Sequence, residues 1–357
     1  MRKTYIIAEA GVNHNGSIEL ARSLVDAAVE AGANAVKFQT FKAENLVSKK
    51  APKATYQKQT TDNEESQFDM LKKLQLSEQD HFDLVEYCEQ RAIDFISTPF
   101  DIDSLHFLTH RLNVKSLKLS SGEITNGPLL LEASKTGKPI FLSTGMSTLS
   151  EIEAALSVLA FGYLNSTESP SKAQFQNAYF SDEGQKLIKT NVTLLHCTTE
   201  YPAPLEEVNL KVLHTMKHAF SLEVGYSDHT KGIAIPVAAA TMGASVIEKH
   251  FTLDRNMPGP DHQASLEPHE LKEMVQSIRD VELAMGNSLK VPVKSELNNI
   301  NIVRKSIVAL EEIKQGEIFS HHNLGVKRPG NGISPMLYWD YLGKEAAKNY
   351  SQDDEIV

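Results

Sequence analysis

Cysteine is almost absent from this sequence: its 357 residues include only Cys88 and Cys197. Two cysteines cannot build the disulfide framework of a small secreted protein, and no CxxC pair is present to indicate a redox or zinc motif. The simplest expectation is a pair of reduced thiols, which is typical of a protein that works in the cytoplasm.

Long apolar runs are missing as well. The chain passes from charged residues at its start to a short apolar run, 5–8, which is too short for the apolar region of a signal peptide. The longest apolar stretch, 233–247, contains Pro236 and Gly243 and falls short of the roughly 20 residues that a membrane-spanning helix needs. We therefore expect no membrane partner.

Positive charge is in deficit, with 36 Lys and Arg against 46 Asp and Glu and a formal charge of −10. So acidic a chain is not expected to bind nucleic acid or anionic membranes without specificity. An anionic small molecule is still compatible with this balance, because a few lysines or arginines inside a cleft can set the local field.

Short β-rich runs alternate with amphipathic segments through most of the chain. In the segment 18–31, for example, apolar residues recur at intervals of three and four, which indicates a helix. The predicted strands are 5–8, 35–38, 94–97, 116–119, 140–142, 192–195, 223–225 and 245–248, and the predicted helices include 18–31, 78–91, 149–161, 210–219 and 271–285. Eight β–α units in about 285 residues predict an α/β fold of the (β/α)8 barrel type, with a doubly wound open sheet as the alternative.

Three segments depart from this rhythm. Residues 162–190 are polar and are interpreted as an inserted surface loop, with a helix near 182–188. Residues 1–285 would form the barrel, 286–300 an extended linker, and 301–357 a second unit. The second unit has few large apolar residues, so we expect it to gain stability by packing on something else.

Polar residues fall regularly where the predicted strands end. In a barrel of this type the carboxyl ends of the strands carry the chemistry, because all eight meet at one face. The residues at or just after these ends are Glu9, Lys37, Gln39, Thr98, Lys118, Ser120, Ser121, Glu123, Ser143, Thr144, His196, Ser227, Asp228, His229, Glu248, Lys249 and His250.

Two histidines stand at the ends of neighbouring predicted strands. His229 and His250 are 21 residues apart and could bring two imidazoles to one ion. Two nitrogen ligands completed by water or substrate oxygens suit Mn²⁺, Co²⁺ or Fe²⁺ better than Mg²⁺, and the lack of a third close His or Cys disfavours structural Zn²⁺. The alternative is a pair of hydrogen-bonded histidines at the edge of the core.

Lysines and carboxylates form the rest of the candidate site. Lys37 and Lys118 could hold phosphate or carboxylate groups as point charges, or one of them could form a Schiff base. Glu9 and Glu123 are candidate acid–base groups, and an apolar setting would raise the pKa of Glu9. The alternatives are a snorkelling lysine, ordinary turn serines at Ser121, Ser143 and Ser227, and carboxylates that only form salt bridges.

Ten motifs in order resemble the bacterial sialic acid (nonulosonic acid) synthase family. They are AEAGVNHNG at 8–16, VKFQT at 36–40, STPF at 97–100, SGE at 121–123, LSTGM at 142–146, HCTTEYP at 196–202, YSDHT at 226–230, EKHFT at 248–252, PGPDH at 258–262 and KRPGNG at 327–332. The resemblance covers nearly the whole chain, including a C-terminal unit that is similar to the antifreeze-like (SAF) domain.

This resemblance implies a (β/α)8 barrel joined to a SAF domain of β-clip type in a domain-swapped homodimer. It implies a metal-dependent enzyme that condenses phosphoenolpyruvate with an N-acetylated mannose-type sugar and releases phosphate. Mn²⁺ would be the metal, with Mg²⁺ or Co²⁺ as alternatives. A Schiff-base pyruvate aldolase or lyase, and an inert barrel that carries a ligand-binding or ice-binding module, are the competing functions.

The resemblance also implies a role for each matching residue. His229 and His250 would bind the metal, and Arg328 would reach the sugar's N-acetyl group in the partner's site; a solvated loop arginine is the alternative for Arg328. Glu9 and Glu123 would be catalytic. Phosphoenolpyruvate or sugar would be bound by Lys37, Gln39, Thr98, Lys118, Ser121, Ser143, Thr199, Tyr201, Ser227 and Asp261.

One stretch bears on the sugar. Residues 198–204 resemble N,N'-diacetyllegionaminate synthases, where many N-acetylneuraminate synthases carry an asparagine after the cysteine. A Thr methyl in place of an amide suits a less hydroxylated sugar, because a buried amide without a partner is costly. The favoured substrate is thus 2,4-diacetamido-2,4,6-trideoxy-mannose, with N-acetylmannosamine as the alternative.

Overall fold

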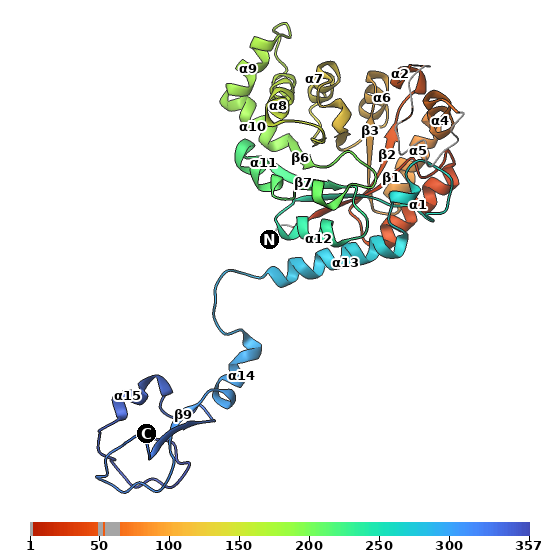
Figure 1. The fold of residues 1–357 in the computed structure, drawn as a ribbon. Coiled ribbons are helices and arrows are strands. Elements are labelled where there is room, and N and C mark those ends of the chain that lie inside the picture. Colours follow the sequence, from red (N-terminus) through yellow and green to blue (C-terminus); the bar gives the residue numbers. More distant parts are fainter. Residues whose placement is uncertain (1–2, 49–52, 54–64) are drawn as a thin grey trace. The chain divides into compact units, whose positions relative to one another are not determined.

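The computed structural model describes residues 3–48, 53 and 65–357. The chain forms two compact units, Met1–Gly286 and Asn287–Val357 (Figure 1). The domain limits predicted from the sequence, 1–285 for the barrel and 301–357 for the second unit, stay predictions.

In the described part of the first unit, eight parallel strands close a barrel, because β1 pairs with both β2 and β8. The predicted barrel is confirmed, and the open sheet was the wrong alternative. In order around the barrel the strands are β1 (Tyr5–Gly11), β2 (Ala35–Thr40), β3 (Asp94–Pro99), β4 (Leu117–Leu119), β5 (Ile140–Ser143), β6 (Val192–His196), β7 (Glu223–Asp228) and β8 (Val246–His250).

Helices surround the barrel, as Figure 1 shows. Their sequences place an apolar stripe toward the strands: in α1, Ala21, Leu24 and Ala28 are fully buried, and the Ser17 side chain caps the first turn. The α-helices in the described part of this unit are α1 (Ile18–Ala31), α2 (Ala43–Leu46), α4 (Gln67–Leu74), α5 (Glu78–Gln90), α6 (Ile102–His106), α7 (Gly127–Lys135), α8 (Leu149–Tyr163), α9 (Lys172–Phe180), α10 (Asp182–Asn191), α11 (Val212–Phe220), α12 (Ala234–Thr241) and α13 (Pro268–Met285).

The strands have two apolar faces for part of their length. The outward residues join the large core between strands and helices, as Ile6, Ala8 and Phe38 do. The inward residues form a small separate cluster that fills the lower barrel: Ile7, Ala35, Ile96, Leu195 and Val246. This cluster is the floor on which the candidate site rests.

The segment 162–190 was wrongly predicted to be a surface loop. It contains α9 and α10, of which only the second had been anticipated. Phe175 of α9 packs against Phe161 of α8 with ring centroids 5.2 Å apart, and Ala178 and Ile188 are buried. The few apolar residues of this polar stretch suffice to dock two short helices onto α8.

The second unit begins with a helix rather than an extended linker. Residues 294–300 of the predicted linker lie in α14 (Lys294–Val303), and an antiparallel pair, β9 (Ser306–Ala309) and β10 (Leu324–Lys327), follows. A short helix, α15 (Tyr338–Tyr341), comes near the end. The unit has its own small core, made by Ile307, Ala309, Ile313, Phe319, Leu324, Ala346, Tyr350 and Ile356. Across the described ranges of both units, no helix combines the length and apolar character needed to cross a bilayer.

Candidate active site

The candidate site begins one step above the apolar floor of the barrel. Side chains two residues apart on a strand point to the same face, so the residue two positions after each floor residue also faces inward. Ile7 is thus followed by Glu9, Ala35 by Lys37, Ile96 by Thr98, and Val246 by Glu248. The interior changes from apolar to ionisable within this single step.

Lys37 lies at the centre of the ionisable layer. Its Nζ is 2.9 Å from Glu9 Oε2 and 3.6 Å from Glu248 Oε2, and it donates a 3.1 Å hydrogen bond to Thr98 Oγ1. All four side chains are buried. The predicted strand-end residues of β1, β2, β3 and β8 therefore meet in one network.

Lys118 joins this network from β4. Its Nζ is 3.6 Å from Glu248 Oε1, and the same carboxylate oxygen accepts a 2.8 Å hydrogen bond from Ser227. Glu248 thus bridges both lysines, although the sequence analysis placed it only among the strand-end residues and gave it no role. Its position two residues before His250, on the same strand face, was the signal that could have found it.

The two buried carboxylates, Glu9 and Glu248, have pKa values shifted in opposite directions. Burial raises the pKa of Glu9 to about 7, although the charge of Lys37 opposes the shift. Burial would also raise the pKa of Glu248, but Lys118 and Lys37 outweigh it and the pKa falls to about 2. Glu248 is therefore ionised at neutral pH, whereas Glu9 can gain or lose a proton there.

The pKa values of the two lysines are also shifted in opposite directions. Burial disfavours the charge on both, but the nearby Glu248 and Glu9 raise the pKa of Lys37 above its ordinary value. For Lys118 burial prevails over the attraction of Glu248, and its pKa is lowered. The site therefore holds a firmly charged lysine beside one that is more easily deprotonated.

The predicted histidine pair is brought together above this layer. The rings of His229 and His250 lie 5.5 Å apart between centroids, and the Tyr201 ring is 4.1 Å from His229 and 5.5 Å from His250. His229 Nδ1 is 2.6 Å from the Thr198 carbonyl oxygen. Donation to that carbonyl requires the proton on Nδ1, which leaves Nε2 with a free lone pair.

Both imidazoles suit a metal. Burial lowers the pKa of His229 to about 4, and burial, reinforced by repulsion between the two rings when both are protonated, lowers that of His250 well below 6.5. Both rings are neutral at pH 7, as ligation requires. His250 Nδ1 is buried without a hydrogen-bond partner among the described residues, and Asp261 Oδ2 lies 4.0 Å away. The described chain has no cluster of three or more His, Cys, Asp or Glu able to hold an ion, so two imidazoles would need oxygens from water or substrate.

The rim of the site comes from β5 and the loops that follow β4 and β6. Ser121 Oγ accepts a 3.0 Å hydrogen bond from the Gly145 backbone and lies 3.1 Å from Cys197 Sγ. Ser143 Oγ is buried and has no hydrogen-bond partner within the described chain, so its hydroxyl is available to a ligand. Thr199 lines an open cavity of about 590 Å³ together with Cys197 and side chains of α8 and α11.

The remaining predicted residues are less tightly joined. Gln39 and Glu123 are half-buried, and Glu123 accepts a 2.6 Å hydrogen bond from Asn126. Asp261 is buried, and burial raises its pKa to about 6. Arg328 is exposed on the loop after β10 in the second unit, so its predicted role stays a prediction.

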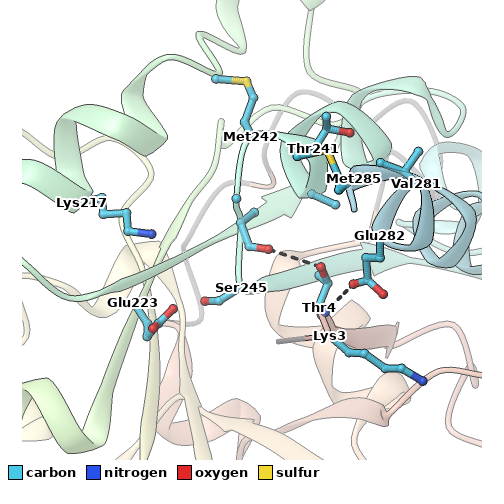
Figure 2. A pocket seen from close by; sticks show the side chains of 13 residues that line it. Lys3, Thr4, Lys217, Glu223, Thr241, Met242, Ser245, Val281, Glu282 and Met285 are labelled. Carbon is cyan, nitrogen blue, oxygen red and sulfur yellow. Dashed lines mark hydrogen bonds between the residues drawn. The ribbon is translucent and has the colours of Figure 1, made fainter. Parts of the chain in front are cut away.

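Another pocket, of about 350 Å³, lies where strands begin rather than end (Figure 2). Thr4, Glu223 and Ser245 line it near the starts of β1, β7 and β8, and Thr4 donates through its backbone N–H to Glu282 over 2.5 Å. In barrels of this type the end where strands begin serves stability, whereas the opposite end carries chemistry. None of the predicted site residues lines this pocket.

Comparison with known proteins follows the same division of the chain. The NeuB family matches residues 24–290, and the SAF domain matches residues 304–354. The N,N'-diacetyllegionaminic acid synthase of Campylobacter jejuni is 53% identical over 356 residues, which cover 100% of this chain and 99% of that protein. The N,N'-diacetyllegionaminic acid synthase of Legionella pneumophila is 45% identical over 353 residues, 99% of this chain and 93% of that protein.

A solved structure agrees with these sequence matches. The N-acetylneuraminic acid (sialic acid) synthetase of Leptospira borgpetersenii, in complex with citrate, matches with a TM-score of 0.67 and 33% identity, over 84% of this chain and 90% of that one. The matches span both units of the chain. The chain therefore belongs to the NeuB family and carries a C-terminal SAF domain.

Proposed function

We propose that this protein condenses phosphoenolpyruvate with 2,4-diacetamido-2,4,6-trideoxy-mannose to give N,N'-diacetyllegionaminate and phosphate. The observation that carries the proposal is the 53% identity to a synthase of that product over the full chain. The synthetase of N-acetylneuraminic acid is only 33% identical, which supports the diacetamido sugar over N-acetylmannosamine. Two free cysteines suit a cytoplasmic enzyme of this kind.

The buried lysines would hold phosphoenolpyruvate. Lys37 and Lys118 offer two cationic groups at the base of the site, and Ser143, at the end of β5, offers a buried hydroxyl that has no partner among the described residues. Their attraction for phosphate and carboxylate is strong because the site excludes bulk water. Glu248, ionised between the lysines, holds both side chains in place.

The reaction forms one carbon–carbon bond and replaces the C2–oxygen bond to phosphate with a C2–oxygen bond to water. C3 of phosphoenolpyruvate attacks the aldehyde carbon of the open-chain sugar, whose oxygen becomes a hydroxyl on taking a proton. Positive charge develops at C2, water adds there and loses a proton, and phosphate leaves from C2 to produce the keto acid. Glu9, with a pKa of about 7, can transfer a proton at the sugar side, and the half-buried Glu123 can accept one from water.

We propose Mn²⁺ as the metal, with Mg²⁺ or Co²⁺ as alternatives. His229 and His250 would hold it through neutral nitrogens, and Tyr201 and Asp261 would flank the sugar beside it. A metal at this position would act as a Lewis acid on the aldehyde oxygen. We further propose a domain-swapped homodimer in which Arg328 of each subunit serves the partner's site.

Turnover of the two candidate sugars tests the proposed function. The purified protein would be incubated with phosphoenolpyruvate, Mn²⁺ and either the 2,4-diacetamido sugar or N-acetylmannosamine, with phosphate and the nine-carbon keto acid as readouts. We expect a higher kcat/KM for the diacetamido sugar. Preference for N-acetylmannosamine would make the protein a neuraminate synthase, and no turnover of any 2-acetamido mannose-type sugar would refute the proposal.

A Schiff-base pyruvate aldolase is the second candidate, and the lowered pKa of the buried Lys118 favours it. Such an enzyme would be trapped covalently by borohydride in the presence of pyruvate and would keep its activity after chelation. The synthase would show the reverse on both counts. Lys118→Arg separates the two further, because an arginine keeps the charge but cannot form the imine.

A further inference from the structure

We propose that Asp228 and Lys249 form a positioning pair that sets the relative placement of His229 and His250; this rests on the metal site proposed above. Each member directly precedes one of the two histidines, and the two are partners in the parallel register of β7 and β8. Both are 1% exposed. Because side chains alternate along a strand, the pair lies on the outer face of the barrel wall while the histidines face inward.

The contacts of the pair enclose the backbone at His229. Asp228 Oδ1 accepts a 2.9 Å hydrogen bond from the Thr230 N–H, and Oδ2 accepts a 3.1 Å bond from the Thr230 hydroxyl. Lys249 Nζ lies 2.5 Å from Asp228 Oδ2 and also donates to the Thr230 carbonyl oxygen. The residues on both sides of His229 are therefore tied to the residue that precedes His250.

Further contacts hold each histidine from its other side. The His229 carbonyl oxygen accepts a 2.9 Å bond from the Ala203 N–H, and the His250 carbonyl oxygen accepts one of the same length from the Leu266 N–H. The ring of His229 is oriented by Thr198. The pair adds, at the last register position of the β7–β8 ladder, a side-chain link between the two strand ends that these separate anchors do not provide.

The location of the charges makes a purely structural role a poor explanation. The same outer face of β7 and β8 otherwise packs into the main hydrophobic core, with Tyr226, Ile247 and Phe251 among its members. A buried ion pair costs desolvation energy, and well-packed apolar side chains of similar volume often stabilise a fold as well or better. An ion pair with fixed hydrogen-bond geometry, however, sets the orientation of its neighbours, and such outer partners of metal ligands commonly tune metal affinity.

The test compares Asp228→Asn, Lys249→Met and the double variant in the full-length protein. We expect each single variant to bind Mn²⁺ about 10–100-fold more weakly than the parent, as for other outer partners of metal ligands. The double variant should bind no more weakly than either single variant, because the pair acts as one unit. Free Mn²⁺ measured by electron paramagnetic resonance gives the affinity without reference to turnover, and the absorption spectrum of bound Co²⁺ should change in shape.

Two controls separate positioning from general destabilisation and from failure of the metal site. Arg279→Met removes a partly exposed tie at the start of β1, the 2.9 Å bond from Arg279 to the Thr4 carbonyl oxygen, together with the ion pair to Glu282, and should lower the melting temperature without changing Mn²⁺ affinity. The proposal is overturned if Asp228→Asn lowers the melting temperature but binds Mn²⁺ like the parent. If His229→Ala also binds Mn²⁺ like the parent, the proposed metal site is wrong, and the positioning role is wrong with it. If His229→Ala loses Mn²⁺ affinity while Asp228→Asn keeps it, only the positioning role is refuted.

Discussion

Glu248 shows how much of this site is decided by single residues. Its carboxylate touches Lys37, Lys118 and Ser227, three side chains from three other strands. Each of these contacts was invisible in the sequence, where the nearest of the three lies 21 residues away. The predicted strand-end residues were nevertheless the right set to inspect, because the strand ends of a closed barrel meet at one face.

Gly145 provides a residue-scale prediction. A Cβ at this position would lie 2.3 Å from Thr199 Oγ1, 2.8 Å from Ser121 Oγ and 3.0 Å from Cys197 Sγ. Gly145→Ala should therefore displace the rim of the site and lower kcat/KM on the order of 10²-fold, because small misplacements of substrate-binding groups have large effects on rate. Gly127→Ala is the matched control, since nothing lies within 4 Å of its Cβ. Equal activity of the two variants would contradict the expected crowding.

The burial of His14 leads us to expect that the free energy of unfolding depends on pH. It is fully buried, and burial lowers its pKa to about 4. Between pH 6.5 and 4 the unfolded chain binds a proton that the folded chain does not, so stability falls as pH falls through this window. The full contribution is present above pH 6.5 and amounts to about 3 kcal/mol at most.

Urea unfolding at pH 7 and pH 5 tests this prediction. His14→Gln should lose less stability between the two pH values than the parent does, whatever its stability at pH 7. Some pH dependence should persist in the variant, because burial also lowers the pKa of His81. An unchanged difference between the two pH values would show that His14 is not the group involved.

At the scale of elements, the positions of the strands could be predicted from the apolar runs, but their ends could not. The predicted strands 5–8, 35–38 and 223–225 extend to Gly11, Thr40 and Asp228 in the structure. The backbone ladder continues past each apolar run because the inward polar side chains pair with one another inside the barrel. Strand ends cannot be read from hydrophobicity where the barrel interior itself becomes polar.

The segment 162–190 supplies the prediction at this scale. Because α9 docks on α8 through Phe175 and Phe161, its backbone amides should exchange with solvent slowly, unlike those of an irregular loop. Phe175→Ala should remove this protection in 172–180 while β6 keeps its own. Hydrogen–deuterium exchange read by mass spectrometry measures both segments in one experiment. Fast exchange of 172–180 in the parent would contradict a docked helix.

At the scale of the whole molecule, the role proposed for Arg328 depends on the pairing of two subunits. It lies on a Pro- and Gly-containing loop of a unit whose core is small. In the proposed homodimer, a subunit with an intact barrel site and one with an intact Arg328 can together make one complete site.

Mixing variants tests this arrangement. His250→Ala and Arg328→Ala should each be inactive alone, and mixed dimers should regain activity, up to about one complete site in each mixed dimer. Subunit exchange would be verified independently with two differently tagged forms. Exchange without any recovery would assign Arg328 to the site of its own subunit.

The sequence by itself determined the alternation of strands and helices, their order, and the polar residues at the strand ends, because these depend on local periodicity. The tertiary structure alone decided which of those residues touch. Glu9 and Glu248 share Lys37 only because β1 closes the barrel against β8, and Asp228 meets Lys249 only in the register of β7 with β8. Contacts between distant residues depend on how the strands close and align, and no local pattern carries that information.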